Sequence, residues 1–279
     1  MRINEYPRAI SFNDGDVLLK DGSDGTKAIP FSDAAASLLE SVLAPTMHKN
    51  LYRGKYLGTS VTAAQKAAIQ NGTFKDLYIG DYWTIGGKDW VIADMDYFYN
   101  IGSTALTKHH LVILPRTPLY SHVMNDDYTT TGGYINSKMR KSGLDSAKST
   151  IRAAFGDMVL THKDIFTNAV SNGKPSGGAW VDSDVELMNE IMVYGCPIFA
   201  PACDGSNIPY LYTTAKTQLS IFRLNMKFLS DMRSWIWLRD VVSAGCFAGV
   251  GDGGGADYYD AGNGHGGGGG VLPYFLIGS

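Results

Sequence analysis

Hydrophobic positions at the C-terminal end of the chain form two aromatic and β-branched runs, over 235–242 and 271–278, with a tract of small residues between them. Runs of this kind, bounded by breakers, are typical of buried strands. The tract between them is poor in side chains that could fill a core. We therefore predict two core strands that hold a surface segment between them.

Two short runs near the N-terminus alternate around a polar turn. Residues 16–20 and 26–30 flank an Asp-Gly-Ser-Asp-Gly segment, which predicts a hairpin, and Ser32 is then the expected N-cap of a helix over 33–43. A hairpin and one helix bury too little surface to be stable alone. Residues 1–48 are therefore predicted to form a small unit that pairs with its own copies or docks on a neighbour.

The second unit, residues 49–279, opens with the alternating pattern of a strand over 51–58. A helix over 63–69 follows, with Thr59 or Ser60 as its N-cap and an Asn-Gly pair at its end. The chain thus begins this unit as strand, then helix.

The next segments predict a hairpin and a further strand. Alternating runs over 77–85 and 90–98 flank a Gly-Gly pair suited to positive φ, and 109–115 is a third strand. Side chains two apart on a strand share a face and adjacent ones do not. Asp94 and Asp96 are thus expected on one face, and of the adjacent histidines at 109 and 110 at most one could join them. That set is incomplete for a metal ion, so we predict no metal site.

From 120 to 204 the pattern indicates helices and loops. A helix is expected over 147–155, and the Ser-Asp-Val-Glu of 183–186 matches a capping box that leads into a helix over 187–192. This region is interpreted as an inserted helical and loop region. Residues 214–222 return to alternation and predict a strand before the C-terminal runs.

Composition and charge narrow the class of protein. The chain has 279 residues, 44% of them hydrophobic and 18% charged, with a net charge of −3 and a pI near 6.0. It is therefore globular, and nothing in its charge favours nucleic acid or an anionic membrane. No apolar run is long enough to span a bilayer, and the start of the sequence has no signal-peptide pattern. We expect no nucleic acid partner, no membrane insertion, and synthesis in a cytoplasm.

The small-residue tract has an unusual composition. From Asp240 to the end there is no Lys, Arg, Glu, Gln, Met, Trp or Thr, and 14 of the 33 glycines lie between Gly245 and Gly278. Most residues of the tract belong to the set reached when both adenines of an AAY codon are replaced by any base. Lys, Glu, Gln, Met and Trp lie outside that set.

The segments 237–241 (Trp-Leu-Arg-Asp-Val) and 270–275 (Gly-Val-Leu-Pro-Tyr-Phe), with the tract between them, resemble the variable region of proteins diversified by phage retroelements. These proteins are similar to the major tropism determinant family. The resemblance implies an α+β fold, with a C-type lectin-like domain of mixed antiparallel sheet and flanking helices behind the small N-terminal unit. It also implies a variable region at about 243–270 and structural roles for Trp237, Arg239, Pro273 and Phe275.

What the resemblance implies for function is a phage or prophage tail receptor-binding protein and not an enzyme. It would reside in the virion, at a tail tip or fibre assembled in the bacterial cytoplasm, as a homo-oligomer, by analogy a trimer. Its ligand would be a bacterial surface protein or glycan, and residues 1–48 would contact other tail proteins. No cofactor is implied. The alternative is a purely structural virion protein whose glycine-rich tail packs against a neighbouring subunit.

The ligand-binding positions are expected where the codon rule explains the residue and its neighbours look fixed: Gly245, Cys246, Gly249, Gly251, Gly253, Gly255, Asp257, Tyr259, Asp260, Gly262, Gly264 and His265. Between them Phe247, Ala248, Val250, Ala256 and Ala261 would be scaffold. Such faces are usually rich in Tyr, Asn and Ser. Since most positions here are glycine, the hypothesis is that this variant binds weakly or has no cognate ligand, and that its only contributing side chains are Asp257, Tyr258, Tyr259, Asp260 and His265.

Enzymatic chemistry finds little support in the sequence. There is no Gly-x-Ser-x-Gly, no His-Glu-x-x-His and no phosphate-cradling glycine loop. An oxidase-like reaction could invoke Cys196 and Cys203, but nothing in the sequence marks either thiol as activated. The signatures of calcium-dependent sugar binding are missing too, so any sugar recognition would be calcium-free.

Overall fold

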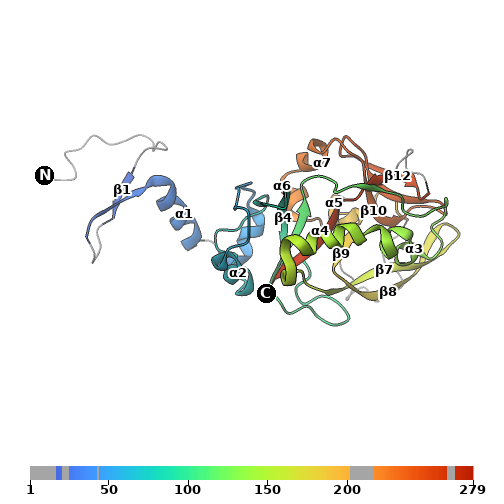
Figure 1. Cartoon of the computed structure of the whole chain (residues 1–279), viewed down its shortest axis with the longest axis horizontal. Helices are drawn as coiled ribbons and strands as arrows, with labels where there is room; N and C mark the ends of the chain where they lie inside the picture. The colour runs from blue at the N-terminus through green and yellow to red at the C-terminus, as the bar shows by residue number, and fades with distance from the viewer. Residues whose placement is uncertain (1–16, 21–24, 43, 202–216, 263–267, 279) are drawn as a thin grey trace. The chain divides into compact units, whose positions relative to one another are not determined.

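The computed structural model describes residues 17–20, 25–42, 44–201, 217–262 and 268–278 (Figure 1). The chain divides into two compact units, Met1–Thr46 and Met47–Ser279. Within the described residues no helix is long and apolar enough to cross a membrane. Mixed helices and antiparallel sheets make the chain an α+β protein.

The N-terminal unit contains the predicted hairpin and helix. Strands β1 (Val17–Lys20) and β2 (Lys27–Pro30) pair antiparallel, and α1 (Phe31–Val42) follows directly. The helix begins one residue before Ser32, so this serine lies in the first turn and the prediction of an N-cap there is wrong. None of the described residues of α1 is buried.

The second unit contains two five-stranded sheets. The first is antiparallel, and its strands in order across the sheet are β3 (Tyr82–Ile85), β4 (Lys88–Met95), β5 (His110–Pro115), β14 (Pro273–Gly278) and β9 (Val185–Leu187). The predicted hairpin is confirmed, since Gly86 and Gly87 join β3 to β4 with φ of 61° and 72°. The predicted third strand is β5.

The second sheet carries the tract. Its strands in order are β12 (Ala256–Asp260), β11 (Cys246–Val250), β10 (Ile236–Val241), β13 (Gly269–Gly270) and β6 (Ser121–His122). Only β10 and β13 are parallel. The two C-terminal strands were correctly predicted, but they belong to different sheets. The tract between them is not only a surface segment, because β11 and β12 extend the sheet from β10.

The largest error concerns the region predicted to be helical. Strands β7 (His162–Ser171) and β8 (Lys174–Ser183) form a long antiparallel hairpin there (Figure 1). Its turn is Asn172-Gly173, with φ of 51° and 71°. Asn-Gly is a strong hairpin signal, since both residues tolerate positive φ.

Three smaller predictions also fail. Residues 51–58 make only isolated bridges, and α2 (Ala63–Gln70) is capped by Thr62, whose hydroxyl accepts the Gln65 N–H at 3.2 Å. Thr59 and Ser60 are therefore not the N-cap. A helix, α6 (Ser220–Leu224), stands in the described part of the strand predicted over 214–222.

The 183–186 motif is not a helix cap. Its residues run from the end of β8 at Ser183 into β9 at Val185, and the next helix, α5 (Glu190–Tyr194), is capped by Asn189. The expected helix over 147–155 is confirmed as α4 (Asp145–Phe155), with Gly156 at its C-cap. The remaining helical segments are η2 (Pro45–Asn50), α3 (Gly133–Asn136), the π-helical turn η3 (Met139–Gly143), η4 (Gly156–Met158) and α7 (Lys227–Asp231).

Candidate ligand-binding face

A buried arginine fixes strand β10, from which the tract emerges. Arg239 Nη1 donates to Asp164 Oδ2 at 3.0 Å, to the Leu187 carbonyl at 3.1 Å and to the Tyr274 hydroxyl at 3.2 Å. The Arg239 and Asp164 side chains are fully buried. Burial and the neighbouring Asp164 raise the pKa of Tyr274, so this phenol stays protonated and donates to the same carboxylate. Arg239 thus joins β10 to β7, β9 and β14.

The next residue, Asp240, holds a loop beside the tract. Its carboxylate accepts the Glu190 N–H at 2.6 Å. The buried Glu190 carboxylate in turn accepts the backbone N–H groups of three consecutive residues, at 2.7, 2.9 and 3.1 Å. These residues are Ile198, Phe199 and Ala200. The Phe199 ring consequently lies 5.1 Å from the Tyr258 ring of β12.

The β11–β12 hairpin separates core residues from exposed ones. Phe247 pairs with Tyr259, and both are buried, with Tyr259 only 8% exposed. The Tyr259 ring lies 4.2 Å from Trp235. Tyr258, on the opposite face of the strand, is 48% exposed. The expectation that Tyr259 belongs to an exposed binding face is therefore corrected, and Tyr258 takes its place.

Most of the expected scaffold positions are buried. Phe247, Ala248, Val250 and Ala261 are buried in the cores on either side of the second sheet, whereas Ala256 is half-buried. The alternating core residues of β11 and β12 therefore hold the hairpin backbone in place.

Two of the predicted glycine positions have no room for a side chain. A Cβ on Gly249 would lie 2.7 Å from the Tyr259 ring and 2.8 Å from the Ile236 carbonyl. A Cβ on Gly262 would lie 2.7 Å from the backbone of Asp127. Any larger residue would displace neighbouring atoms, so these two glycines do not fit the expectation of freely variable contact positions.

Other glycines of the hairpin are open. A Cβ on Gly253 or Gly255 would meet no atom within 4 Å, and one on Gly251 would make only ordinary contacts from 3.6 Å. Gly245 is intermediate, since its Cβ would lie 3.1 Å from the Tyr128 carbonyl. The turn between β11 and β12 can therefore carry side chains of many kinds.

The remaining candidates lie at the surface. Asp260 is exposed, Asp257 is half-buried, and the half-buried Cys246 donates its thiol to Asp260 Oδ1 at 3.2 Å. Burial, followed by the nearby Asp260 carboxylate, raises the pKa of the Cys246 thiol, which disfavours the nucleophilic thiolate. Gly264 and His265 lie outside the described residues, as does Cys203.

A polar hollow adjoins the end of the tract and was not anticipated. It is an open depression of about 400 Å³, and its lining residues among those the structure describes are all polar, including Asn125, Asp126, Asp127, Lys138 and Lys141. Its loop is bound to the tract, since Asn125 N–H donates to the Ala261 carbonyl at 2.9 Å. Thr130 is bound to the Ser243 and Ala244 carbonyls at 2.8 and 2.9 Å. Its described lining residues all lie between Asn125 and Ser142, in a stretch predicted only as helices and loops.

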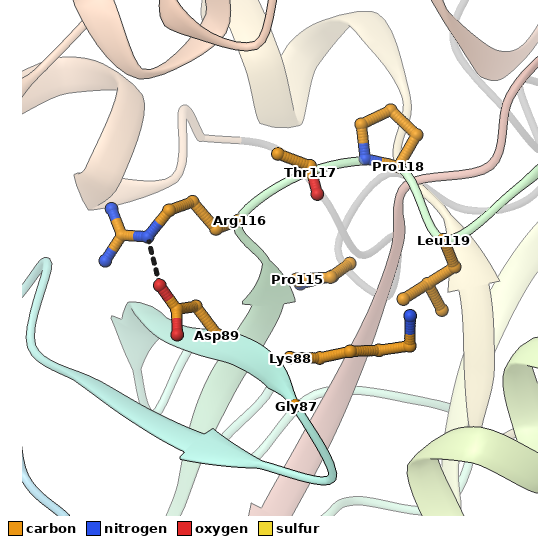
Figure 2. Close-up of a pocket in the computed structure, with 8 residues that line it drawn as sticks. All are labelled: Gly87, Lys88, Asp89, Pro115, Arg116, Thr117, Pro118 and Leu119. Atoms are coloured by element: carbon orange, nitrogen blue, oxygen red, sulfur yellow. Dashed lines mark hydrogen bonds and ion pairs between the residues drawn. The ribbon is translucent and has the colours of Figure 1, made fainter.

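A second pocket lies at the turn between β3 and β4. Figure 2 shows Arg116 and Asp89 facing each other at one end, where Nε and Oδ2 are 3.0 Å apart, and Lys88 extending toward Leu119. Asp89 also accepts from Thr84 Oγ1 at 2.7 Å. Among the described residues of the lining there is no histidine, cysteine or serine, and its carboxylate, Asp89, is bonded to Arg116 and Thr84.

Asp96 and His109 lie just outside β4 and β5, and a bulge in β4 falls between Ile92 and Asp94. Asp94 is buried and accepts the Ser220 N–H at 2.8 Å, while Asp96 has φ of 55° and bonds to His109 Nδ1 at 2.7 Å. The expectation that Asp94 and Asp96 share a strand face is therefore wrong, because β4 ends at Met95. Among the described residues no group of three or more His, Cys, Asp or Glu side chains could hold a metal ion.

Comparisons with protein-family models, with curated proteins and with solved structures find no match to this chain.

Proposed function

We propose that this chain is a phage or prophage tail receptor-binding protein, in which a C-type lectin-like domain displays a retroelement-diversified surface to a bacterial ligand. The observation that carries the proposal is the β11–β12 hairpin. Its backbone is fixed by buried residues, while its turn at Gly251, Gly253 and Gly255 accepts side chains without displacing a neighbour. A diversified binding face needs this combination, since substitutions must change contacts without changing the fold.

The framework around the hairpin supports the same proposal. Trp237 and Arg239 are fully buried, and Asp240 and Glu190 hold the Phe199 loop against Tyr258. Of these residues, Trp237 and Glu190 are of types outside the set reached from AAY codons. The contact residues are then Cys246, Asp257, Tyr258 and Asp260 together with the three open glycines, a smaller set than the codon rule alone selects.

Self-association is part of the proposal. Helix α1 places Phe31, Ala35, Leu38 and Val42 at the alternating four- and three-residue spacing of a coiled-coil seam, and Leu38 and Val42 are 65% and 70% exposed. A helix of 12 residues is marginal in isolation. Packing against copies of itself would bury this seam, as expected of a trimeric tail protein.

Deep sequencing of the locus in a growing population of its source tests the function. We expect substitutions at the first two bases of AAY-derived codons, concentrated at 246, 251, 253, 255, 257, 258 and 260. A near-copy of the coding segment and a reverse transcriptase gene should lie nearby. A flat substitution profile would contradict the proposal and favour a structural virion protein with a glycine-rich tail.

A further inference from the structure

We propose that the polar hollow beside the tract is a constant subsite, that is, a part of the binding site whose residues lie outside the variable tract. Its ligand is neutral and polyhydroxylated, namely a bacterial surface polysaccharide. The inference rests on the proposed function, because it names the ligand class of the same face. It adds residues outside the tract to the binding site.

The lining of the hollow suits hydroxyl groups. Amide, hydroxyl, carboxylate and ammonium groups provide both donors and acceptors, and no apolar side chain contributes. Sugar hydroxyls donate and accept at once, so they pair with such a mixed set. A protein ligand would instead be expected to insert aromatic or aliphatic anchors into an apolar pocket. The volume of about 400 Å³ falls within the range of small-molecule sites.

The charges of the hollow balance. Two aspartates face two lysines, and Lys138 forms an ion pair with Asp126. A phosphate or sulfate would meet the two carboxylates, and a cation would meet the two ammonium groups. The hollow therefore favours a ligand without net charge, while Asp127 and Lys141, both exposed, can each bond to a hydroxyl.

The hollow is held in shape before any ligand binds. The Asn125 side chain accepts the Lys138 N–H at 2.9 Å and donates to the Thr129 carbonyl at 2.6 Å. Thr129 Oγ1 also donates to Thr131 Oγ1 at 2.9 Å. A site fixed in this way loses less conformational entropy on binding.

An exposed aromatic residue belongs to the loop that lines the hollow, and its backbone lies against the tract. Tyr128 belongs to the same loop and is 61% exposed, and its carbonyl lies against Gly245. A tyrosine ring offers an apolar face to the C–H side of a sugar ring and a hydroxyl at its edge. A saccharide in the hollow could thus extend over Tyr128 toward Cys246 and Asp260, so diversified positions would adjust the specificity of a constant glycan site.

The test uses the full-length protein on an array of neutral bacterial capsular and O-antigen polysaccharides, each spotted intact and after periodate oxidation of its diols. We expect saturable, calcium-independent binding to at least one intact polysaccharide and loss of that binding after oxidation. Replacing Asp127 and Lys141 together by alanine preserves the net charge and should lower the affinity about tenfold or more, because two charge-assisted hydrogen bonds are lost. The matched control replaces Lys163 and Asp182 by alanine, an ion pair on β7 and β8 in which the aspartate is 66% exposed, and should bind like the unmodified protein.

Binding to no intact polysaccharide, binding that survives oxidation, or equal affinity of the Asp127/Lys141 variant would overturn the inference. Failure of the proposed function is distinguishable from these results. If the substitution profile at the tract is flat but glycan binding is intact, the proposal of diversification fails and the glycan subsite still stands. The opposite result is also informative: the tract is diversified, no polysaccharide on the array binds, and binding to whole bacteria is lost after protease treatment. That result would identify a protein ligand and contradict the glycan subsite.

Discussion

Arg239 Nη1 and Asp164 Oδ2 lie 3.0 Å apart, and both side chains are fully buried where β10 meets β7. Removing one partner would leave the other charged group without compensation in the interior. We expect Arg239→Ala to lower the free energy of unfolding by about 3–5 kcal/mol. Arg152→Ala breaks an ion pair in which the arginine is 63% exposed and should cost at most about 1 kcal/mol. Urea denaturation measures both, and equal effects would contradict the structural role assigned to Arg239.

The glycines of the tract should divide into two groups when they are enlarged. Gly249→Ala forces its Cβ against the Tyr259 ring and the Ile236 carbonyl, and we expect a loss of about 1–3 kcal/mol. Gly253→Ala and Gly255→Ala enter open space and should change stability by no more than about 0.5 kcal/mol. Thermal unfolding of the three variants compares them directly. A Gly249 variant as stable as the other two would return position 249 to the variable set.

Replacing Tyr259 should lower stability, whereas replacing its neighbour Tyr258 should affect ligand binding. Tyr259→Ala empties a space packed by Trp235 and Trp237 and should cost about 3–5 kcal/mol, in line with other large-to-small changes of buried aromatic residues. Tyr258→Ala removes a side chain that is 48% exposed and should leave stability within about 0.5 kcal/mol. On the proposed function Tyr258→Ala weakens ligand binding, so a binding assay on the folded Tyr258 variant completes the comparison. Unaltered binding would remove Tyr258 from the contact set.

The sequence correctly predicted those helices and strands that depend on turn, cap or strand-forming residues close together in the chain. The Gly86-Gly87 hairpin, the helix that ends at Gly156 and the aromatic strand β10 all formed where expected. The pairing of β7 with β8 was missed although Asn172-Gly173 marks its turn. The Ser183 and Glu186 side chains of the motif do make a contact, at 3.0 Å, but it joins the end of β8 to β9. Glu186 also accepts from Tyr134 at 2.8 Å, and this tertiary bond replaces the helix cap.

The candidate site could be refined only with the tertiary structure. The codon rule could place Tyr258 and Tyr259 in the tract, but only the pairing of β11 with β12 decides which of them faces the core. In the same way, Gly262 is restricted by Asp127, which lies far away in the sequence. The loop of residues 125–131, which contributes to the polar hollow, also bonds to the tract across a long stretch of sequence.

Stability should fall as the pH is lowered from neutral because of His162. Burial lowers its pKa from 6.5 to about 4, and neither ring nitrogen has a hydrogen-bond partner among the described residues. Between these pH values the unfolded chain takes up a proton that the folded protein excludes, so the free energy of unfolding decreases as the pH falls. A shift of this size corresponds to about 3 kcal/mol, complete near pH 4 and absent above pH 7.

The surroundings of His162 indicate how this prediction can be tested. The charged and titratable groups that act on it are Asp164, His110, Arg239 and Asp184, and the Phe98 ring lies 4.4 Å away. Burial also lowers the pKa of His110, which adds a change of the same sign. His162→Phe keeps an aromatic ring in this apolar contact and removes the titration. We expect urea titrations of this variant between pH 7.5 and 4 to show a smaller decrease in unfolding free energy than those of the unmodified protein. Parallel curves for the two proteins would show that His162 is not the source of the acid sensitivity.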